Sequence, residues 1–220
     1  NGEFSGYLAC NTDYHNLTHT LDCFMATARL IDGKNSCETK FNEELAVNML
    51  LAALFHDTGY LQESDDPVGT GAKYTKNHVE RSVTFIEKNI ARFSLSRTQA
   101  EMIARLVSCT GLKADWVVMN FKESDQARAG AVIGTADLLG QMSDRAYLEK
   151  LLFLYYEFRE AGIEGFNTEF DILRKTLDFY ESTRERMDST LMKVYQYAEY
   201  HFQKRYNIPK NMYMDSIENQ

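Results

Sequence analysis

Apolar residues recur three and four positions apart along most of this chain, which is the spacing of one face of an α-helix. The pattern predicts an all-α protein whose helices are separated by capping residues and turn clusters. Only two prolines interrupt it, Pro67 and Pro209. We expect helices over residues 14–30, 43–55, 77–90, 96–109, 124–142 and 144–162.

The first of these helices is expected to begin after Thr12 or Asp13 and to end at a turn over residues 32–36. Its core face is expected to comprise the apolar residues at helical spacing, namely Leu17, Leu21, Phe24, Met25 and Ala28. The second helix is expected to be capped by Asn42 and to end at His56-Asp57, where Gly59 permits a sharp exit.

A heptad pattern of apolar residues occupies the last part of the chain and predicts one long helix over residues 168–206. Such a helix would be roughly 55–60 Å long, whereas a compact domain of this size is about 45 Å across. The sequence therefore predicts a domain over residues 1–165 and a C-terminal helix within 166–220 that packs back on it or forms a homodimer. The expected seam consists of Phe170, Leu173, Leu177, Tyr180, Met187, Leu191, Val194 and Ala198, with Arg184 and His201 as polar members.

Composition narrows the classes of partner. The 220 residues are 44% hydrophobic, which suits a sizeable core, and their net charge of −8 argues against a nucleic-acid partner and a polybasic membrane surface. No apolar run is long enough to span a bilayer, and no basic-then-apolar leader opens the sequence. The four cysteines form no C-x-x-C pair, so we interpret them as free thiols of a reducing, cytoplasmic environment.

Side chains that bind metals stand at helical spacing in three of the predicted helices. His15 and His19 are four positions apart and project from one face of a helix. His56-Asp57 ends a buried helix, where a carboxylate is costly unless a metal or another cation meets it. Asp137 lies in an otherwise apolar run, so we expect it to face inward. His19, His56, Asp57 and Asp137 can therefore converge from three helices on a divalent metal ion.

Glycines near Asp137 support this convergence. Gly130 and Gly134 precede it on the same helix face, and we expect them to let a ligand-bearing helix approach, while Gln141 lies one turn further along. Two imidazoles and two carboxylates, completed by water, suit a six-coordinate Mn, Fe, Co, Ni or Mg ion. Zn is the alternative, although it usually prefers fewer ligands or sulfur.

The order of these motifs resembles the HD superfamily of metal-dependent phosphohydrolases. Tyr14-His15-Asn16-x-x-His19 is similar to the Y-H-N-x-x-H motif of cyclic-nucleotide phosphodiesterase catalytic domains. Residues 54–59 resemble the hydrophobic-HD-x-G motif of bacterial HD domains, residues 77–82 resemble the helix start that follows it, and residues 135–138 resemble the final A-D-hydrophobic motif. The resemblance covers about residues 14–142 and implies an HD-domain helical bundle.

The resemblance also implies the roles of the residues. His19, His56, Asp57 and Asp137 would be the metal ligands. In the corresponding mechanism, Asp57 or Asp137 would also orient the attacking water. A metal-activated water would attack phosphorus, and His15 would donate a proton to the leaving oxygen as general acid. The implied substrate is a phosphate ester, namely a nucleotide or cyclic-nucleotide phosphodiester.

Further candidates have competing interpretations. His78 is expected to be a second-metal ligand, a phosphate contact or a residue at a helix N-terminus. Lys73 and Lys76 either close over a phosphate or are ordinary surface lysines, and Gln141 is a candidate for contact with the base. Cys109 stands where many two-metal HD proteins carry a histidine, so we expect one metal ion rather than two. Cys109 itself is then a small buried residue.

Two other functions compete with the enzyme. The first is a catalytically weakened HD module that binds or signals, with the C-terminal helix as its output or dimer element. The second is a purely structural metal, which a helical domain of this size does not need for its core. His15 favours the enzyme, because a structural descendant would have no use for a general acid.

Overall fold

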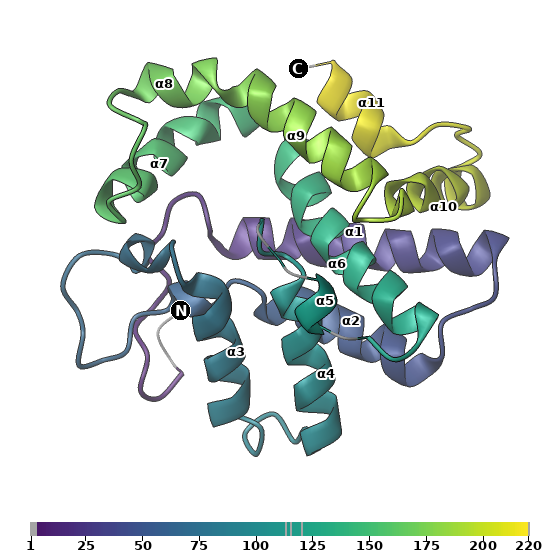
Figure 1. Cartoon of the computed structure of the whole chain (residues 1–220), viewed down its shortest axis with the longest axis horizontal. Coiled ribbons are helices and arrows are strands. Elements are labelled where there is room, and N and C mark those ends of the chain that lie inside the picture. Colours follow the sequence, from purple (N-terminus) through teal and green to yellow (C-terminus); the bar gives the residue numbers. More distant parts are fainter. Residues whose placement is uncertain (1–3, 113, 115, 120, 220) are drawn as a thin grey trace.

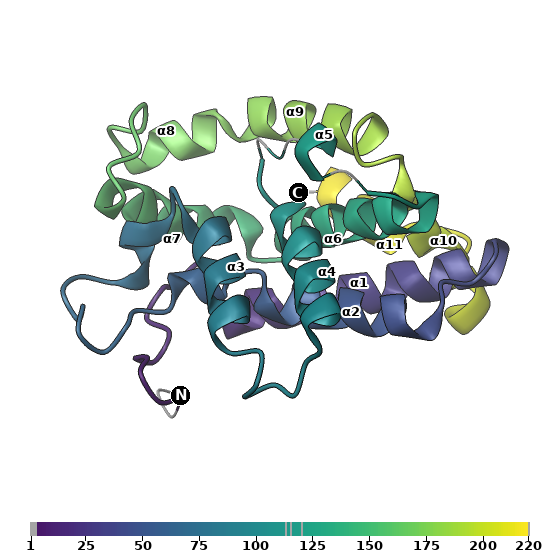
Figure 2. The same ribbon diagram turned by 60° about the horizontal axis from the view of Figure 1, so that its bottom comes forward.

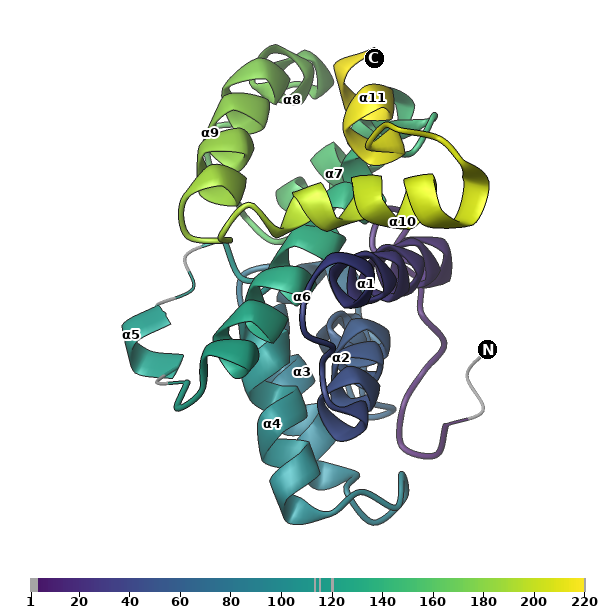
Figure 3. The same ribbon diagram turned by 90° about the vertical axis from the view of Figure 1, so that its right-hand side faces the viewer.

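Helix α1 (Leu17–Cys37) is the element against which much of the molecule packs. It contacts α2 (Glu43–Phe55), α6 (Ser124–Met142) and α10 (Tyr197–Tyr206). Figure 3 shows α2, α1 and α10 stacked on one another, with α6 beside them. The structure, a computed structural model, describes residues 4–112, 114, 116–119 and 121–219.

The prediction of an all-α protein is confirmed, because the described residues form helices and no strand beyond an isolated bridge between Tyr7 and Glu63. Figure 1 shows the arrangement of these helices, and Figure 2 shows α8 and α9 along one side, α1 and α2 along the other, and α6 and α7 between them. The remaining elements are η1 (Thr58–Tyr60), η2 (Gly71–Tyr74), α3 (His78–Lys88), α4 (Arg97–Ser108), α5 (Trp116–Met119), α7 (Tyr147–Glu160), α8 (Glu169–Arg174), α9 (Thr176–Asp188), η3 (Val194–Gln196) and α11 (Met212–Glu218).

The predicted helix boundaries hold best where a side chain caps the helix. Asn42 accepts a hydrogen bond from Leu45 N and α2 covers the predicted residues. Ser96 and Gln99 form a capping box at the start of α4. At α1, by contrast, the cap is Asn16 rather than Thr12 or Asp13, because the Asn16 side chain accepts from the amides of Thr18 and His19. His15 therefore precedes the helix, and the expectation that it shares a helix face with His19 is wrong.

The prediction that α1 ends at residues 32–36 is wrong, because the helix continues through Gly33 to Cys37. Gly33 serves a close approach of two helices rather than a turn. A Cβ atom at this position would lie 1.8 Å from the carbonyl oxygen of Tyr197. The sequence pattern of turn formers could not reveal this contact, because its partner lies in α10, far along the chain.

The predicted core face of α1 is wrong for three of its five residues. Leu17 is 66% exposed, and Leu21 and Met25 are exposed as well, whereas Phe24 packs against the core as predicted. The helical period is correct, but the side that faces the interior combines small and polar side chains with Leu30 and Ile31. The buried residues of α1 are His19, Cys23, Ala26, Thr27, Leu30, Ile31, Gly33 and Lys34.

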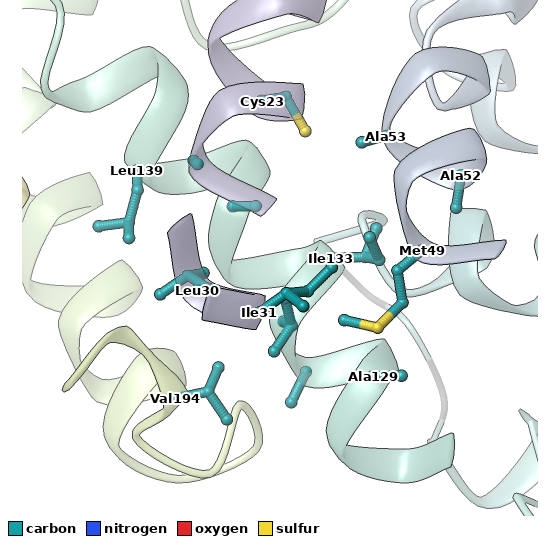
Figure 4. Packing of buried hydrophobic residues seen from close by; sticks show 14 of the residues in the cluster. Cys23, Leu30, Ile31, Met49, Ala52, Ala53, Ala129, Ile133, Leu139 and Val194 are labelled. Atoms are coloured by element: carbon teal, nitrogen blue, oxygen red, sulfur yellow. The ribbon is translucent and has the colours of Figure 1, made fainter. Parts of the chain in front are cut away.

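The core lies where α1, α2 and α6 meet, and the chain after α9 completes it. Figure 4 shows Leu30 and Ile31 of α1, Met49 of α2 and Ile133 of α6 converging, with Val194 beside them. All five are at least nine-tenths buried. Because residues from both ends of the chain share this core, the C-terminal segment folds with the N-terminal helices rather than apart from them.

The prediction of one long C-terminal helix is wrong. Residues 168–206 form α8, α9, η3 and α10, and the main break follows Asp188 at Ser189-Thr190. Met192 and Lys193 then adopt left-handed backbone conformations with φ of 55° and 56°. The break lets buried Leu191 reach α6, where a Cβ on Gly134 would lie 3.0 Å from its Cδ2 atom.

This break divides the predicted seam. Met187, Leu191, Val194 and Ala198 are buried in the protein's own core. Phe170, in contrast, is 65% exposed, and Leu173 and Leu177 are exposed too. A homodimer through the C-terminal region stays a prediction. Of the predicted seam, only these exposed residues of α8 and α9 now support it.

No helix within the described residues combines the length and the apolar character that crossing a membrane requires. Cys10, Cys23, Cys37 and Cys109 are all free thiols. The cytoplasmic location stays a prediction.

Replacing Gly33 by alanine should lower the free energy of unfolding by roughly 3 kcal/mol, because the new methyl group would collide with the backbone of Tyr197. Chemical denaturation of the wild type and the variant measures this difference. The control is Gly111→Ala, where the nearest atom to the new Cβ would be 3.6 Å away. Equal losses in both variants would contradict the proposed close contact of α1 with α10.

Asp32 of α1 should stabilise the fold above about pH 4 and not below pH 2. Arg205 of α10 donates to Asp32 at 2.9 Å, and Arg205 first and then His201 lower the pKa of Asp32 to about 2. A carboxyl whose pKa falls on folding stabilises the native state above its unfolded pKa, and the effect disappears as the pH falls through the folded value. Since Arg205 is half exposed, we expect Asp32→Asn to cost about 1 kcal/mol at pH 7.

Denaturation curves at several pH values test this dependence, with Asp178→Asn on the surface of α9 as the control. A difference between wild type and Asp32→Asn that persists unchanged at pH 2 would contradict the assignment.

Candidate metal centre

Four predicted ligands from α1, the end of α2 and α6 converge at one place. His19, His56 and Asp57 each offer a ligand atom, and these atoms all lie within 4.8 Å of one another. The Nε2 atoms of the two histidines are 3.2 Å apart, and Asp57 Oδ2 lies 3.3 and 3.2 Å from them. Asp137 Oδ1 approaches the same nitrogens at 3.2 and 3.6 Å. The structure therefore brings together all four side chains that the sequence singled out.

Capping and a glycine position the two helices that carry His19 and Asp137. The Asn16 cap fixes the first turn of α1, which contains His19. Gly140 of α6 lies against α1, where a Cβ would be 2.9 Å from Cys23 N. The expectation that Gly130 and Gly134 admit a ligand-bearing helix is wrong. A Cβ at either would instead meet Cys109 at the end of α4.

The corner at the end of α2 is fixed by backbone contacts with α3. Ser82 donates its hydroxyl to His56 O at 2.6 Å and accepts from Gly59 N at 2.8 Å. Gly59 lies so close to α3 that a Cβ would be 1.9 Å from His78 O. The glycine therefore serves this close approach as well as the exit from α2, and it sets the direction in which His56 and Asp57 project.

The tautomer of His56 points to a bound cation. His56 Nδ1 donates to Ala53 O at 2.8 Å, so a neutral His56 presents the lone pair of Nε2 to His19 and Asp57. Asp57 Oδ2 is buried and has no hydrogen-bond partner among the described residues. Lone pairs that converge in a buried space repel one another unless a proton or a metal ion lies between them.

The pKa shifts of the four side chains also indicate a site for a cation. Burial would lower the pKa of both histidines, but Asp137 and Asp57 raise the pKa of His19 to about 9, and Asp57 raises that of His56 well above its usual range. Burial likewise opposes the ionisation of Asp57 and Asp137, yet the histidines hold the pKa of both carboxyls well below the usual range. The cluster therefore attracts positive charge, and protons and a metal ion compete for it.

The spacing of the donor atoms fits a divalent metal. An ion about 2.1 Å from each ligand places neighbouring ligands about 3.0–3.4 Å apart, depending on whether they meet at right or tetrahedral angles. The contacts of 3.2–3.6 Å between the donor atoms lie close to this range. Two imidazole nitrogens and two carboxylate oxygens are a donor set for Mn, Fe, Co, Ni, Mg or Zn.

A histidine–glutamate pair lies next to the cluster. His15 Nδ1 is 2.6 Å from Oε2 of Glu157, a buried residue of α7 that also accepts from Tyr14 N at 2.7 Å. Tyr60 stacks on His15 with ring centroids 4.4 Å apart and on His78 at 4.7 Å. His78 Nε2 lies 3.9 Å from the other carboxylate oxygen of Asp57. These contacts hold His15 beside the ligands.

The sequence analysis missed Glu157 and the stacking role of Tyr60. Glu157 had a visible signal, since it is an acidic residue within the apolar and aromatic run 151–158. Its pairing with His15 had none, because the two residues are separated by most of the chain. Tyr60 lies three residues after Asp57, but its two stacking partners come from the segment before α1 and from the start of α3.

The predicted substrate residues are engaged in other contacts. Lys73 donates to Asp66 and to Val68 O at 2.7 and 2.6 Å, and Lys76 donates to Gly162 O at 2.7 Å. Gln141 Oε1 accepts the hydroxyl of Tyr14 at 2.8 Å. These contacts order the loop before α3, the end of α7 and the start of α1. A role in substrate binding stays a prediction for all three.

Cys109 lies in the packing between helices. It is fully buried, its sulfur lies 3.3 Å from Met119 Sδ, and burial raises the pKa of the thiol to about 12. A thiol that stays protonated is a poor metal ligand. The interpretation of Cys109 as a small buried residue agrees with this environment.

The family model described as Npun_R2479-like matches residues 64–199. This is more than half of the chain, so the protein belongs to the Npun_R2479-like family. The matched segment includes His78, Asp137 and Glu157 but begins after His56 and Asp57. No curated protein and no solved structure matches the chain.

Replacing His19 or Asp137 by alanine should weaken metal binding by roughly a hundredfold or more, because each removes one of four donor atoms. Mass spectrometry of metal content, on protein loaded with Mn and then desalted, measures the loss. His201→Ala is the matched control, since this histidine pairs with Asp32 away from the cluster. Full metal occupancy in either ligand variant would overturn the ligand assignment.

Proposed function

We propose that this member of the Npun_R2479-like family is a metal-dependent phosphohydrolase that resembles the HD superfamily. Its substrate would be a phosphate ester, namely a nucleotide or cyclic-nucleotide phosphodiester. The observation that carries the proposal is the convergence of His19, His56, Asp57 and Asp137 beside His15. The order of these residues along the chain is that of the HD motifs.

The metal would be held by the two histidine Nε2 atoms and by one oxygen each of Asp57 and Asp137. A divalent ion in this place supplies Lewis acidity toward phosphoryl oxygens and activates water at neutral pH. Asp57 also faces His78 with its second oxygen, at 3.9 Å. Either Asp57 or Asp137 would orient the attacking water.

His15 is suited to donate a proton to the leaving oxygen. Glu157 binds Nδ1 at 2.6 Å, so the proton for transfer sits on Nε2, the other ring nitrogen. The stacked ring of Tyr60 fixes the plane of the imidazole, and the Tyr60 hydroxyl lies 3.4 Å from His15 Nε2. His15 precedes the Asn16 cap of α1, and its ring lies 5.9 Å from that of His19, so its Nε2 atom would lie near a phosphate bound at the ligands.

Replacing His15 by alanine should lower turnover of a phosphodiester by roughly a hundredfold or more while leaving metal content unchanged. Glu157→Gln should also lower turnover, because it removes the carboxylate that binds His15 Nδ1 and orients the ring. Turnover is measured on generic phosphodiesters and on cyclic nucleotides, with Mn, Mg, Ni and Zn compared.

The matched control for Glu157→Gln is Glu160→Gln, one turn further along α7, where the carboxylate binds Thr70 instead. Unchanged turnover in His15→Ala would remove His15 from the reaction. A wild-type protein that binds metal but cleaves no ester would favour the alternative, a weakened HD module that binds or signals.

A further inference from the structure

Arg186 of α9 contacts the turn at the end of α4. Its Nη2 atom donates to Cys109 O at 3.0 Å and to Gly111 O at 2.9 Å. Both carbonyls belong to the turn that ends α4. Both hydrogen bonds use Nη2, so this nitrogen is held in place while Nη1 takes part in neither.

Neighbours of the two carbonyls place this guanidinium beside α6, close to the metal centre. Cys109 O lies against Gly134, where a Cβ would be 2.7 Å away, and Gly134 is about one turn before Asp137 on α6. Gly111 lies beside Val79 at the start of α3. The turn that Arg186 binds therefore packs against α6 about one turn before the candidate ligand Asp137.

The second nitrogen of the guanidinium lacks a partner. Nη1 is buried from solvent and has no hydrogen-bond acceptor among the residues that the structure describes. No carboxylate in the described ranges forms an ion pair with Arg186 either. A buried, charged donor is costly to leave unpaired, so its position requires an anionic acceptor during function.

Arg184, two residues earlier, differs from Arg186 because it forms ion pairs with carboxylates. It pairs with Asp188 and Glu218 at 3.5 Å each, on another face of α9. Burial lowers the pKa of Arg186, whereas the negative charge of Asp137 opposes that change. The charge of Arg184 is thus balanced by its own neighbours, whereas the Nη1 atom of Arg186 has no acceptor among the described residues.

We propose that Arg186 is a phosphate-binding residue of the metal centre. Nη1 would donate to a nonbridging oxygen of the substrate's phosphate, while Nη2 stays on Cys109 O and Gly111 O. The planar fork of arginine matches the oxygens of phosphate, and a partly buried guanidinium binds them strongly. This inference rests on the proposed function, because it assigns the phosphate group that the metal centre would act on.

The test uses inorganic phosphate as the probe and isothermal titration calorimetry on the full-length chain loaded with Mn. Arg186→Gln should weaken phosphate binding by roughly tenfold or more, with metal content unchanged. Arg186→Lys should recover part of the affinity, since it restores charge without the fork. Arg184→Gln is the matched control and should bind phosphate as the wild type does. With an ester substrate, Arg186→Gln should raise KM more than it lowers kcat.

Equal phosphate affinity of Arg186→Gln and wild type would overturn the proposal and leave Arg186 as a structural cap of α4. Failure of the metal-loaded wild type to bind phosphate would overturn it as well. Should Arg186→Gln not fold, the comparison of Arg186→Lys with wild type decides in the same way. Phosphate binding that depends on Arg186, in a protein that hydrolyses no ester, would support this inference while contradicting the proposed function.

Discussion

Two imidazole nitrogens that face each other at 3.2 Å are the constraint on which the rest of the structure depends. His19 and His56 come from different helices, and each Nε2 atom also faces the oxygens of Asp57 and Asp137. Such a cluster in a buried place is stable only around positive charge. The close contacts elsewhere, such as Gly140 against α1, serve to hold the three helices at the distance this cluster requires.

The C-terminal half of the chain contains the partner of His15 and the arginine that we propose as a phosphate ligand. Glu157 of α7 orients His15, and the end of α9 brings Arg186 to the carbonyls at the end of α4. Both residues lie within the segment that the Npun_R2479-like family model matches, whereas His19 and His56 precede it. The break after α9 matters for this arrangement, because a continuous helix would carry the residues after Asp188 away from α6 and α1.

Features that depend on a few neighbouring residues could be predicted from the sequence. The Asn42 cap and the span of α2 could be predicted because capping and helical periodicity act over a few residues. The four candidate ligands could be picked out because His19 lies at helical spacing and because His56, Asp57 and Asp137 interrupt or end apolar runs. In contrast, the sequence misled at Gly33 and after Asp188, where distant contacts override local preference. The pairing of His15 with Glu157 could not be predicted for the same reason, since no periodic pattern links a residue before α1 to one on α7.

The most direct test of the central claim is X-ray diffraction from crystals of the protein loaded with Mn, recorded at the Mn absorption edge. The account predicts an anomalous peak about 2.1 Å from the Nε2 atoms of His19 and His56 and from one oxygen each of Asp57 and Asp137. A loaded crystal whose anomalous peaks all lie elsewhere, with these four side chains contacting only one another, would contradict the account.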